Sequence, residues 1–342
     1  MTNVTLAEIQ KMPKVELHRH IDGAVNPKLL YAFAGGRYGG KYKSHKEVAD
    51  LVRILPDMSV EEIMAQFDSV VCWMQNKPNI ESVFFNQVLD LLQENIVYTE
   101  LRFAPEYHTK GRLSVKEVIE TALTGILYGV RYCNSKGRRI DVRLILCIAR
   151  ECSNEMSKRI AQEAINFSER GVVGIDLACN EALYPPELHK EAFAITFNTA
   201  IKRTVHAGEF HGNRIKNIKT ALTILRADRL GHAIGLTRDT DFLRFCFENK
   251  VGIEICPVSN IICGNIPSIK MLELDEFNME GVLFNINSDD PALFHASLSE
   301  NLYRTAQAYD WSLKDLKRLM RDAMEMSFVS QEEKLKILAK NF

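Results

Sequence analysis

Eight short apolar runs, rich in β-branched residues, recur along this chain of 342 residues. A nearly continuous hydrophobic run of this length is typical of a parallel strand that is covered on both faces. Because amphipathic helical stretches separate most of the runs, the sequence predicts an α/β protein whose strand–helix repeats close into a (β/α)8 barrel. The predicted strands are Val15–Ile21, Ile96–Phe103, Ile140–Ile148, Val172–Leu177, Ile201–Val205, Arg229–Ile234, Val251–Cys256 and Val282–Ile286.

The predicted helices between these strands include Val115–Asn134, which Ser114 precedes as a start signal. Three others are Ser157–Arg170, Asn217–Arg226 and Thr240–Asn249. An open doubly wound sheet is the alternative architecture. It is disfavoured because no G-x-G-x-x-G motif follows any predicted strand.

Two segments interrupt the repeat. Residues 27–92 form a long insert of helical pattern between the first two strands, and we expect its glycine-rich stretch Ala34–Lys43 to be a flexible turn. In a barrel this connection leaves the C-terminal face, where active sites lie, so we expect the insert to form a lid. The tail Ser312–Phe342 is expected to form helices packed outside the barrel. No Pro/Ser-rich linker divides the chain, and we therefore expect one domain over residues 1–342.

Composition narrows the cellular setting. The formal net charge of −1 gives no global field for nucleic acid. The eight cysteines are scattered without a C-x-x-C pair, which favours reduced cytosolic thiols over disulfides. The N-terminus lacks a basic segment followed by an apolar core, and no apolar run is long enough to span a bilayer. We expect a cytoplasmic protein with a small-molecule substrate and with neither a nucleic-acid nor a membrane partner.

His18 and His20 are the first residues that suggest chemistry. Alternate side chains of a strand face the same way, so both imidazoles point to one side and can hold one ion. This spacing suits zinc or a similar divalent metal. A pair of core or surface histidines is the alternative, and for an isolated H-x-H motif it would be the better interpretation.

Four other strand ends also present polar groups, and this favours the metal site. They are Thr204–Glu209, Arg229–Ala233, Glu254–Asn260 and Asn285–Pro291. The C-terminal ends of barrel strands converge, so three histidines and a carboxylate suffice for one divalent ion with an open water position. A nearby Glu can transfer protons while the metal lowers the pKa of its water.

These segments also resemble a known family. Lys14–Ala24 is similar to the opening motif of the adenosine deaminase family, and Val205–Glu209, Arg229–His232 and Ser288–Pro291 are similar to its three other signatures. They occur in the family's order and at similar separations, over essentially the whole chain. The resemblance implies a (β/α)8 barrel with one zinc ion that hydrolyses a 6-aminopurine.

The resemblance also implies roles for individual residues. The zinc ligands would be His18, His20, His206 and Asp289. Glu209 corresponds to the acid that protonates purine N1, and His232 to the residue that orients the hydroxide nucleophile and assists its deprotonation. Asp290 corresponds to the group bonded to purine N7, and Asp22 to the carboxylate that meets the sugar 5′-hydroxyl.

Other substrate contacts are expected from the same resemblance. The segment containing Ile63 and Phe67 is similar to the lid helix that packs against the nucleoside, although an ordinary core-facing helix has the same pattern. Phe103 is expected to line the pocket. Cys179 stands where the family commonly has Gly, whose backbone meets purine N3, so its side chain should narrow the pocket. Binuclear relatives bridge two metals with a Lys after the fourth strand, and its absence favours one metal.

Three function classes are compatible with this pattern. The first is a hydrolase that deaminates adenosine and 2′-deoxyadenosine to inosine and 2′-deoxyinosine. The second is a deaminase of another 6-aminopurine, namely adenine, 5′-methylthioadenosine or aminofutalosine, because Cys256–Asn260 and Asn287–Phe294 resemble the adenine and aminofutalosine branches. The third is a non-catalytic nucleoside binder or extracellular ligand, against which the intact ligand set, Glu209 and the missing signal sequence argue. The sequence leaves the native metal and the oligomeric state open.

Overall fold

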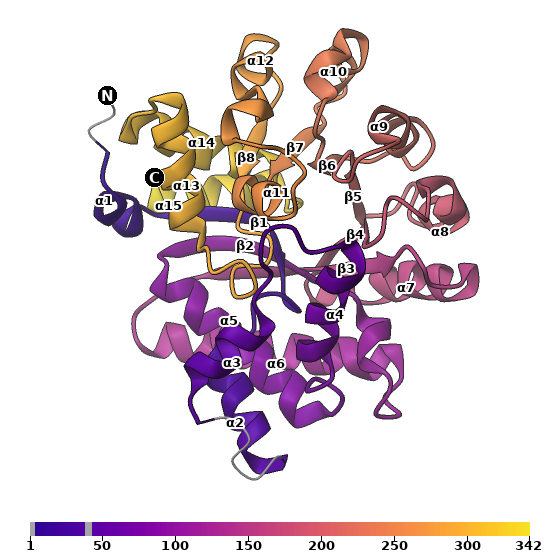
Figure 1. Cartoon of the computed structure of the whole chain (residues 1–342), viewed down its shortest axis with the longest axis vertical. Coiled ribbons are helices and arrows are strands. Elements are labelled where there is room, and N and C mark those ends of the chain that lie inside the picture. Colours follow the sequence, from indigo (N-terminus) through magenta and orange to yellow (C-terminus); the bar gives the residue numbers. More distant parts are fainter. Residues whose placement is uncertain (1–3, 38–42) are drawn as a thin grey trace.

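Eight parallel strands, paired with their neighbours in chain order, form the centre of the computed structural model, which describes residues 4–37 and 43–342 (Figure 1). All eight predicted strands are present, with ends within about two residues of the expected ones. Their bounds are β1 Lys14–His20, β2 Ile96–Phe103, β3 Asp141–Ala149, β4 Val172–Ala178, β5 Lys202–Ala207, β6 Arg229–His232, β7 Gly252–Ile255 and β8 Phe284–Ile286.

The barrel closes where the segment after β8 meets β1. Asp289 forms a parallel bridge with Arg19. Its backbone N–H donates to the carbonyl of His18 at 3.1 Å, and its carbonyl accepts from the N–H of His20 at 2.9 Å. Closure therefore places Asp289 beside both histidines of the H-x-H motif.

The outer layer consists of helices that follow the strands (Figure 1). The longest is α6, Val115–Ser135, which begins with a capping box between Ser114 and Glu117. It packs closely on α5, Lys77–Gln93, because Gly125 and Gly129 have no side chains; a Cβ at Gly125 would lie 2.5 Å from the carbonyl oxygen of Glu81. The others are α7 Asn154–Asn166, α8 Lys190–Ile195, α9 Arg214–Thr223, α10 Thr240–Glu248 and α12 Leu274–Met279. The short helix α11, Pro257–Ile262, lies nearer the centre of the barrel and contributes Ser259 to the pocket described below.

The insert between β1 and β2 contains α2 Pro27–Arg37, α3 His45–Val52, α4 Val60–Val71 and α5. The expected glycine-rich turn is wrong at its start, because α2 continues through Gly35 to Arg37. A glycine costs a helix only about 1 kcal/mol relative to alanine, and Pro27 at the first position favours the helix. The rest of that expected turn, 38–42, lies outside the described residues.

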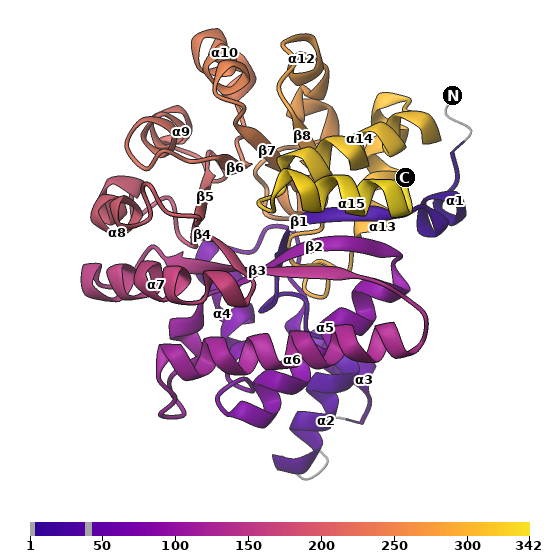
Figure 2. The ribbon, with the colours of Figure 1, turned by 180° about the vertical axis from the view of Figure 1, so that it is seen from behind.

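The C-terminal tail packs on the barrel, as expected, at the N-terminal ends of the strands (Figure 2). It follows α13, Leu298–Tyr309, and forms α14 Leu313–Met326 and α15 Gln331–Asn341. Val15 and Tyr98, near the starts of β1 and β2, pack against Ala323 and Met324. Arg229 at the start of β6 donates to the carbonyl of Met326 at 3.0 Å. The tail thus covers the end of the barrel opposite the strand termini where active sites lie. Within the described part of the chain, no helix has the length and apolar character needed to cross a bilayer.

Candidate active site

A pocket opens at the C-terminal ends of the strands, and most of the predicted site residues line it. One wall is polar and consists of His20, Asp22, His206, Glu209, His232, Asp289 and Asp290. The lining also includes apolar side chains, namely Ile63, Met64, Phe67 and Val71 of α4, together with Phe210 and Phe294. The insert thus contributes to the pocket lining through α4.

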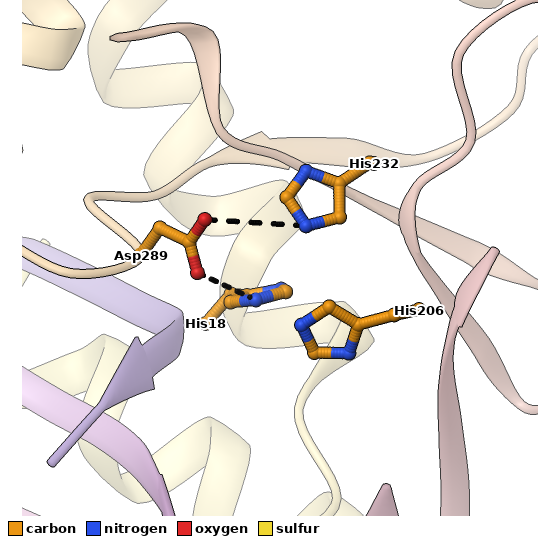
Figure 3. A group of neighbouring side chains, drawn as sticks. All are labelled: His18, His206, His232 and Asp289. Atoms are coloured by element: carbon orange, nitrogen blue, oxygen red, sulfur yellow. Dashed lines mark ion pairs between the residues drawn. The ribbon is translucent and has the colours of Figure 1, made fainter. Parts of the chain in front are cut away.

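Four side chains form a buried cluster in the pocket floor. Ligand-type atoms of His18, His206, His232 and Asp289 all lie within 4.8 Å of one another (Figure 3). His18 Nε2 is 3.1 Å from Asp289 Oδ1, and His232 Nε2 is 4.0 Å from Asp289 Oδ2. His20 borders the same cluster, since its Nε2 is 3.1 Å from His206 Nε2 and 3.6 Å from Asp289 Oδ1.

The hydrogen bonds of these rings distinguish the histidines. His18 Nδ1 faces Glu254 at 2.8 Å and His206 Nδ1 faces Asp176 at 3.1 Å. A carboxylate accepts, so each Nδ1 bears the proton and each Nε2 presents a lone pair to the centre. For His232 the relation is reversed, because Asn260 Nδ2 donates to its Nδ1 at 2.9 Å. The Nε2 of His232 therefore bears the proton.

The centre of the cluster is consequently rich in electron pairs. His18 Nε2 and Asp289 Oδ1 are both acceptors, yet they lie 3.1 Å apart, and buried His18 Nε2 has no hydrogen-bond partner. Two imidazole nitrogens, those of His20 and His206, also face each other at 3.1 Å. Imidazole and carboxylate donors in this close set fit a divalent cation of the zinc type.

Buried ion pairs connect strands of the barrel that carries the histidine–aspartate cluster. Arg102 pairs with Asp176 at 2.8 Å and with Glu254 at 2.9 Å, and Arg229 pairs with Glu254 at 2.7 Å. Burial alone would raise the pKa of Glu254, but Arg102 and Arg229 hold that pKa well below its usual range. Glu254 therefore stays ionised and fixes the proton on His18 Nδ1.

Other carboxyl groups in the pocket behave differently. Burial raises the pKa of Glu209 to about 8, with Asp289 and Glu181 adding to the effect. Burial also raises the pKa of Asp290 well above its ordinary value, as do its neighbours Asp289 and Asp22. With a pKa of about 8, Glu209 is protonated near neutral pH and can donate a proton. The raised pKa of Asp290 also favours its protonated form. Burial lowers the pKa of His232, which lies 3.7 Å from Glu209, to about 3, so this ring is neutral.

The loop after β1 brings Asp22 into the pocket. Asp22 Oδ1 lies 3.0 Å from His108 Nε2, and His108 Nδ1 lies 3.1 Å from the carbonyl of Met74 just after α4. These contacts connect the insert, through Met74 and His108, to Asp22. Cys179, after β4, also lines the pocket, with its backbone at φ 79° and its Sγ 3.4 Å from Tyr107 Oη.

Phe103 is the one predicted contact residue that the pocket lining does not include. Its ring is fully buried against Phe84 of α5 and the ring of His108, at centroid distances of 5.0 and 5.5 Å. It faces the layer between β2 and the insert, so it supports His108 and does not face the cavity.

Four site residues have no individual role in the sequence prediction, although Glu254 and Asn260 lie in one of the polar segments that it names. Asp176, Glu254 and Asn260 fix the imidazole tautomers, and His108 contacts Asp22. A charged residue inside an apolar strand, such as Asp176 in β4 or Glu254 in β7, is a signal for such a supporting function, since a buried charge needs a partner.

The comparisons with known proteins agree with this geometry. Residues 13–341 match the family model described as adenosine deaminase. The chain belongs to the adenosine deaminase family. Adenosine deaminases from Mycobacterium ulcerans and Clostridium acetobutylicum are each 32% identical to it, over 98% and 97% of this chain and 95% and 98% of theirs. The apo structure of the N6-methyl-AMP deaminase from Arabidopsis thaliana aligns with a TM-score of 0.85 at 25% identity, over 98% of both chains.

The adenosine deaminase family match includes every strand of the barrel and every residue of the polar wall. As a member of that family, the chain is a hydrolytic deaminase whose site combines a histidine–aspartate cluster with a protonated Glu. The names of its relatives differ in the purine derivative, which is adenosine in one case and N6-methyl-AMP in the other.

Proposed function

We propose that this protein is a zinc-dependent deaminase that converts adenosine and 2′-deoxyadenosine into inosine and 2′-deoxyinosine with release of ammonia. The single observation behind this proposal is the pairing of Glu209, whose pKa is raised to about 8, with the His/Asp cluster in one pocket. An acid that is protonated at neutral pH beside a metal-type site is what hydrolysis of an aminopurine needs.

His18, His20, His206 and Asp289 would hold one Zn²⁺ per chain. The choice of His20 over His232 as the third imidazole is supported by the proton on His232 Nε2, since a ligand nitrogen must offer a lone pair. When bound, the ion supplies a water of lowered pKa as the nucleophile and leaves a coordination position open for it.

The pocket residues would act on the purine itself. Glu209 donates its proton to N1, which makes C6 electrophilic. A C6–O bond forms with the water oxygen, the C6–N6 bond breaks, and the amine leaves as ammonia with one proton of the water. The second proton of the water restores the acid form of Glu209. His232, 3.7 Å from Glu209, orients the attacking water through its Nε2–H. Protonated Asp290 donates to N7, and the backbone of Cys179 faces N3.

Asp22 would recognise the sugar, because its carboxylate can accept a hydrogen bond from the 5′-hydroxyl. Among the described residues that line the pocket there is neither Lys nor Arg. A 5′-phosphate would meet buried Asp22 without a compensating cation, which is costly in a low-dielectric site. This favours a nucleoside over a nucleotide, in contrast to the substrate named for the Arabidopsis relative.

Another 6-aminopurine is the second candidate, and Cys179 is the observation that favours it. Its side chain lines the pocket at a position where a glycine would leave room. Adenine, 5′-methylthioadenosine and aminofutalosine differ from adenosine in the group at N9 or at the 5′ position, and a narrowed pocket would discriminate among such groups.

The proposal is tested with purified zinc-loaded protein and a substrate panel. Adenosine, 2′-deoxyadenosine, adenine, 5′-methylthioadenosine, aminofutalosine and AMP are compared by kcat/KM, with ammonia release as the common measurement. Adenosine and 2′-deoxyadenosine should have the highest values. Strong turnover of adenine or aminofutalosine with negligible turnover of adenosine would overturn the substrate assignment and leave deamination in place.

A further inference from the structure

Glu181 is a buried carboxylate in the loop after β4, and it contacts the loop that contains Glu209. Its side chain is 3% exposed. Oε1 accepts from Gly208 N at 2.7 Å and from Asn217 Nδ2 at 2.9 Å. Oε2 accepts from Glu209 N at 2.9 Å and from Phe210 N at 3.3 Å. The carboxylate is thus surrounded by three successive backbone amides and one side-chain amide.

The backbone after β5 is shaped for this contact. Gly208 has φ +78°, in the left-handed region, and this turn points successive N–H groups to one side. This positive φ strains any residue that has a side chain, and a Cβ at Gly208 would also displace Ile218 Cδ1, which lies 2.7 Å away. Such a nest of amides is a ready site for an anion, and here the chain supplies its own anion from the neighbouring loop.

The carbonyl oxygen of Glu209 is also fixed by a hydrogen bond. Arg214 donates from one Nη to the carbonyl of Glu209 at 2.9 Å and from Nε to the carbonyl of Phe210 at 3.2 Å. The N–H of Glu209 therefore binds a carboxylate and its C=O binds a guanidinium. These charge-assisted hydrogen bonds fix the Cα of Glu209 and hence the direction of its side chain toward His232, 3.7 Å away.

The carboxylate of Glu181 also acts on Glu209 at a distance. Its negative charge is one of the neighbouring charges that, after burial and Asp289, raise the pKa of Glu209. The same residue thus fixes the backbone of the acid and favours its protonated form.

We propose that Glu181 is a positioning residue for the deamination reaction, which acts through Glu209 by clamping the Gly208–Phe210 amides. The inference rests on the proposed function, since it assigns Glu181 to the proton transfer at purine N1. A positional error of about 1 Å at a reacting group can cost roughly 100-fold in rate. Loss of the clamp should therefore appear in kcat.

The main variant is Glu181→Gln, which keeps the volume but replaces one acceptor oxygen with an N–H donor that faces backbone amides. With the preferred 6-aminopurine of the wild-type protein, kcat should fall by about 10- to 100-fold, while KM changes by less than about threefold and the zinc content stays at the wild-type value. The matched control is Asp228→Asn at the opposite end of the barrel. Asp228 also accepts a backbone N–H, that of Arg203 at 2.9 Å, and its variant should keep the wild-type kcat.

A double variant separates positioning from general damage. Because Glu181 acts through Glu209, the Glu181→Gln/Glu209→Gln protein should be no slower than Glu209→Gln alone. Multiplicative losses in the double variant would overturn the proposal, as would a Glu181→Gln protein with kcat within threefold of wild type.

If Glu181→Gln does not fold, Asn217→Ala is used, which removes one partner of Glu181 and leaves the three amides. It should lower kcat severalfold in the wild-type background and leave it unchanged in the Glu209→Gln background; any other pattern rejects the clamp.

Failure of the proposed function would be recognised separately. It would appear as a wild-type protein that releases no ammonia from any 6-aminopurine of the panel. Failure of the clamp would appear only in the variants of an active wild-type protein.

Discussion

A Cβ built on Gly23 would lie 1.8 Å from Oδ1 of Asp290. The loop after β1 and the loop after β8 therefore approach so closely that the position of the Asp290 side chain depends on the missing side chain of Gly23. This contact explains in physical terms why a glycine follows Asp22.

We expect Gly23→Ala to lower kcat/KM for adenosine by about 10- to 100-fold, because the methyl group must displace a group assigned to purine N7, and small displacements of positioned groups are costly. Steady-state kinetics with a zinc assay measure this effect. The control is Gly35→Ala in α2, where an added Cβ meets no atom within 4 Å. Equal activity of the two variants would contradict the assigned role of Asp290.

His206→Ala should remove both the metal and the activity, because the variant loses one of four ligands and leaves the buried Asp176 without its imidazole partner. Elemental analysis of the purified protein measures metal per chain. Exposed His211 is the matched control, and its alanine variant should retain one zinc. Full occupancy in His206→Ala, or two metals per wild-type chain, would reject the ligand set.

Glu209→Gln should keep the metal and lose most of the turnover. Glutamine preserves the shape but has no proton of suitable pKa for N1, and general acid catalysis contributes roughly 10²–10⁴-fold. Single-turnover kinetics with metal-loaded protein measure the chemical step directly. A variant that turns over within a few-fold of wild type would make Glu209 a structural residue.

The activity should also depend on pH through the same carboxyl group. Burial raises the pKa of Glu209 to about 8, and the protonated form is the active one, so activity should be retained below that pH and decline as pH rises through it. A profile of kcat/KM against pH, recorded at constant zinc content, tests the sign. Activity that increases steadily from pH 7 to pH 9 would be inconsistent with Glu209 as the acid.

Asp22→Ala should damage the turnover of adenosine and leave that of free adenine almost unchanged, because adenine has no 5′-hydroxyl. A hydrogen bond to a charged group is worth about 1.5–3 kcal/mol, which corresponds to a loss of roughly ten- to a hundredfold. The ratio of kcat/KM values for the two substrates measures this. Equal losses with both substrates would assign Asp22 to the support of His108, which it contacts at 3.0 Å.

The fold and the approximate ends of the strands could be predicted because the pattern of hydrophobic residues depends directly on which residues are buried. The β2 strand, Ile96–Phe103, has the predicted bounds, and all eight of its residues are buried. The glycine-rich segment after Ala34 misled the prediction because the cost of a glycine in a helix is small enough for the surrounding turns of α2 to offset. The number of glycines in a segment does not indicate whether the surrounding helix is stable enough to offset their cost.

In the site, the sequence predicts which polar groups converge but not how they are supported. The residues of the H-x-H motif were predicted from strand alternation, whereas the bond between His18 and Glu254 joins residues 236 positions apart. Likewise the orientation of Phe103 depends on how α5 packs on β2, where Phe84 occupies the facing position. Such pairings form only in the closed barrel, so they cannot be predicted from the residue pattern within one segment.

The seam between β1 and the segment after β8 has a consequence for folding. Asp289 reaches His18 and His20 only when the last strand has docked on the first, more than 260 residues away along the chain. A ligand that binds only the docked state stabilises that state in proportion to its free concentration and affinity. Zinc should therefore stabilise the barrel late in folding, when its two ends have met. A nascent or truncated chain without β8 would bind the metal weakly. Chelation of the metal should first weaken the contact between β1 and the segment after β8.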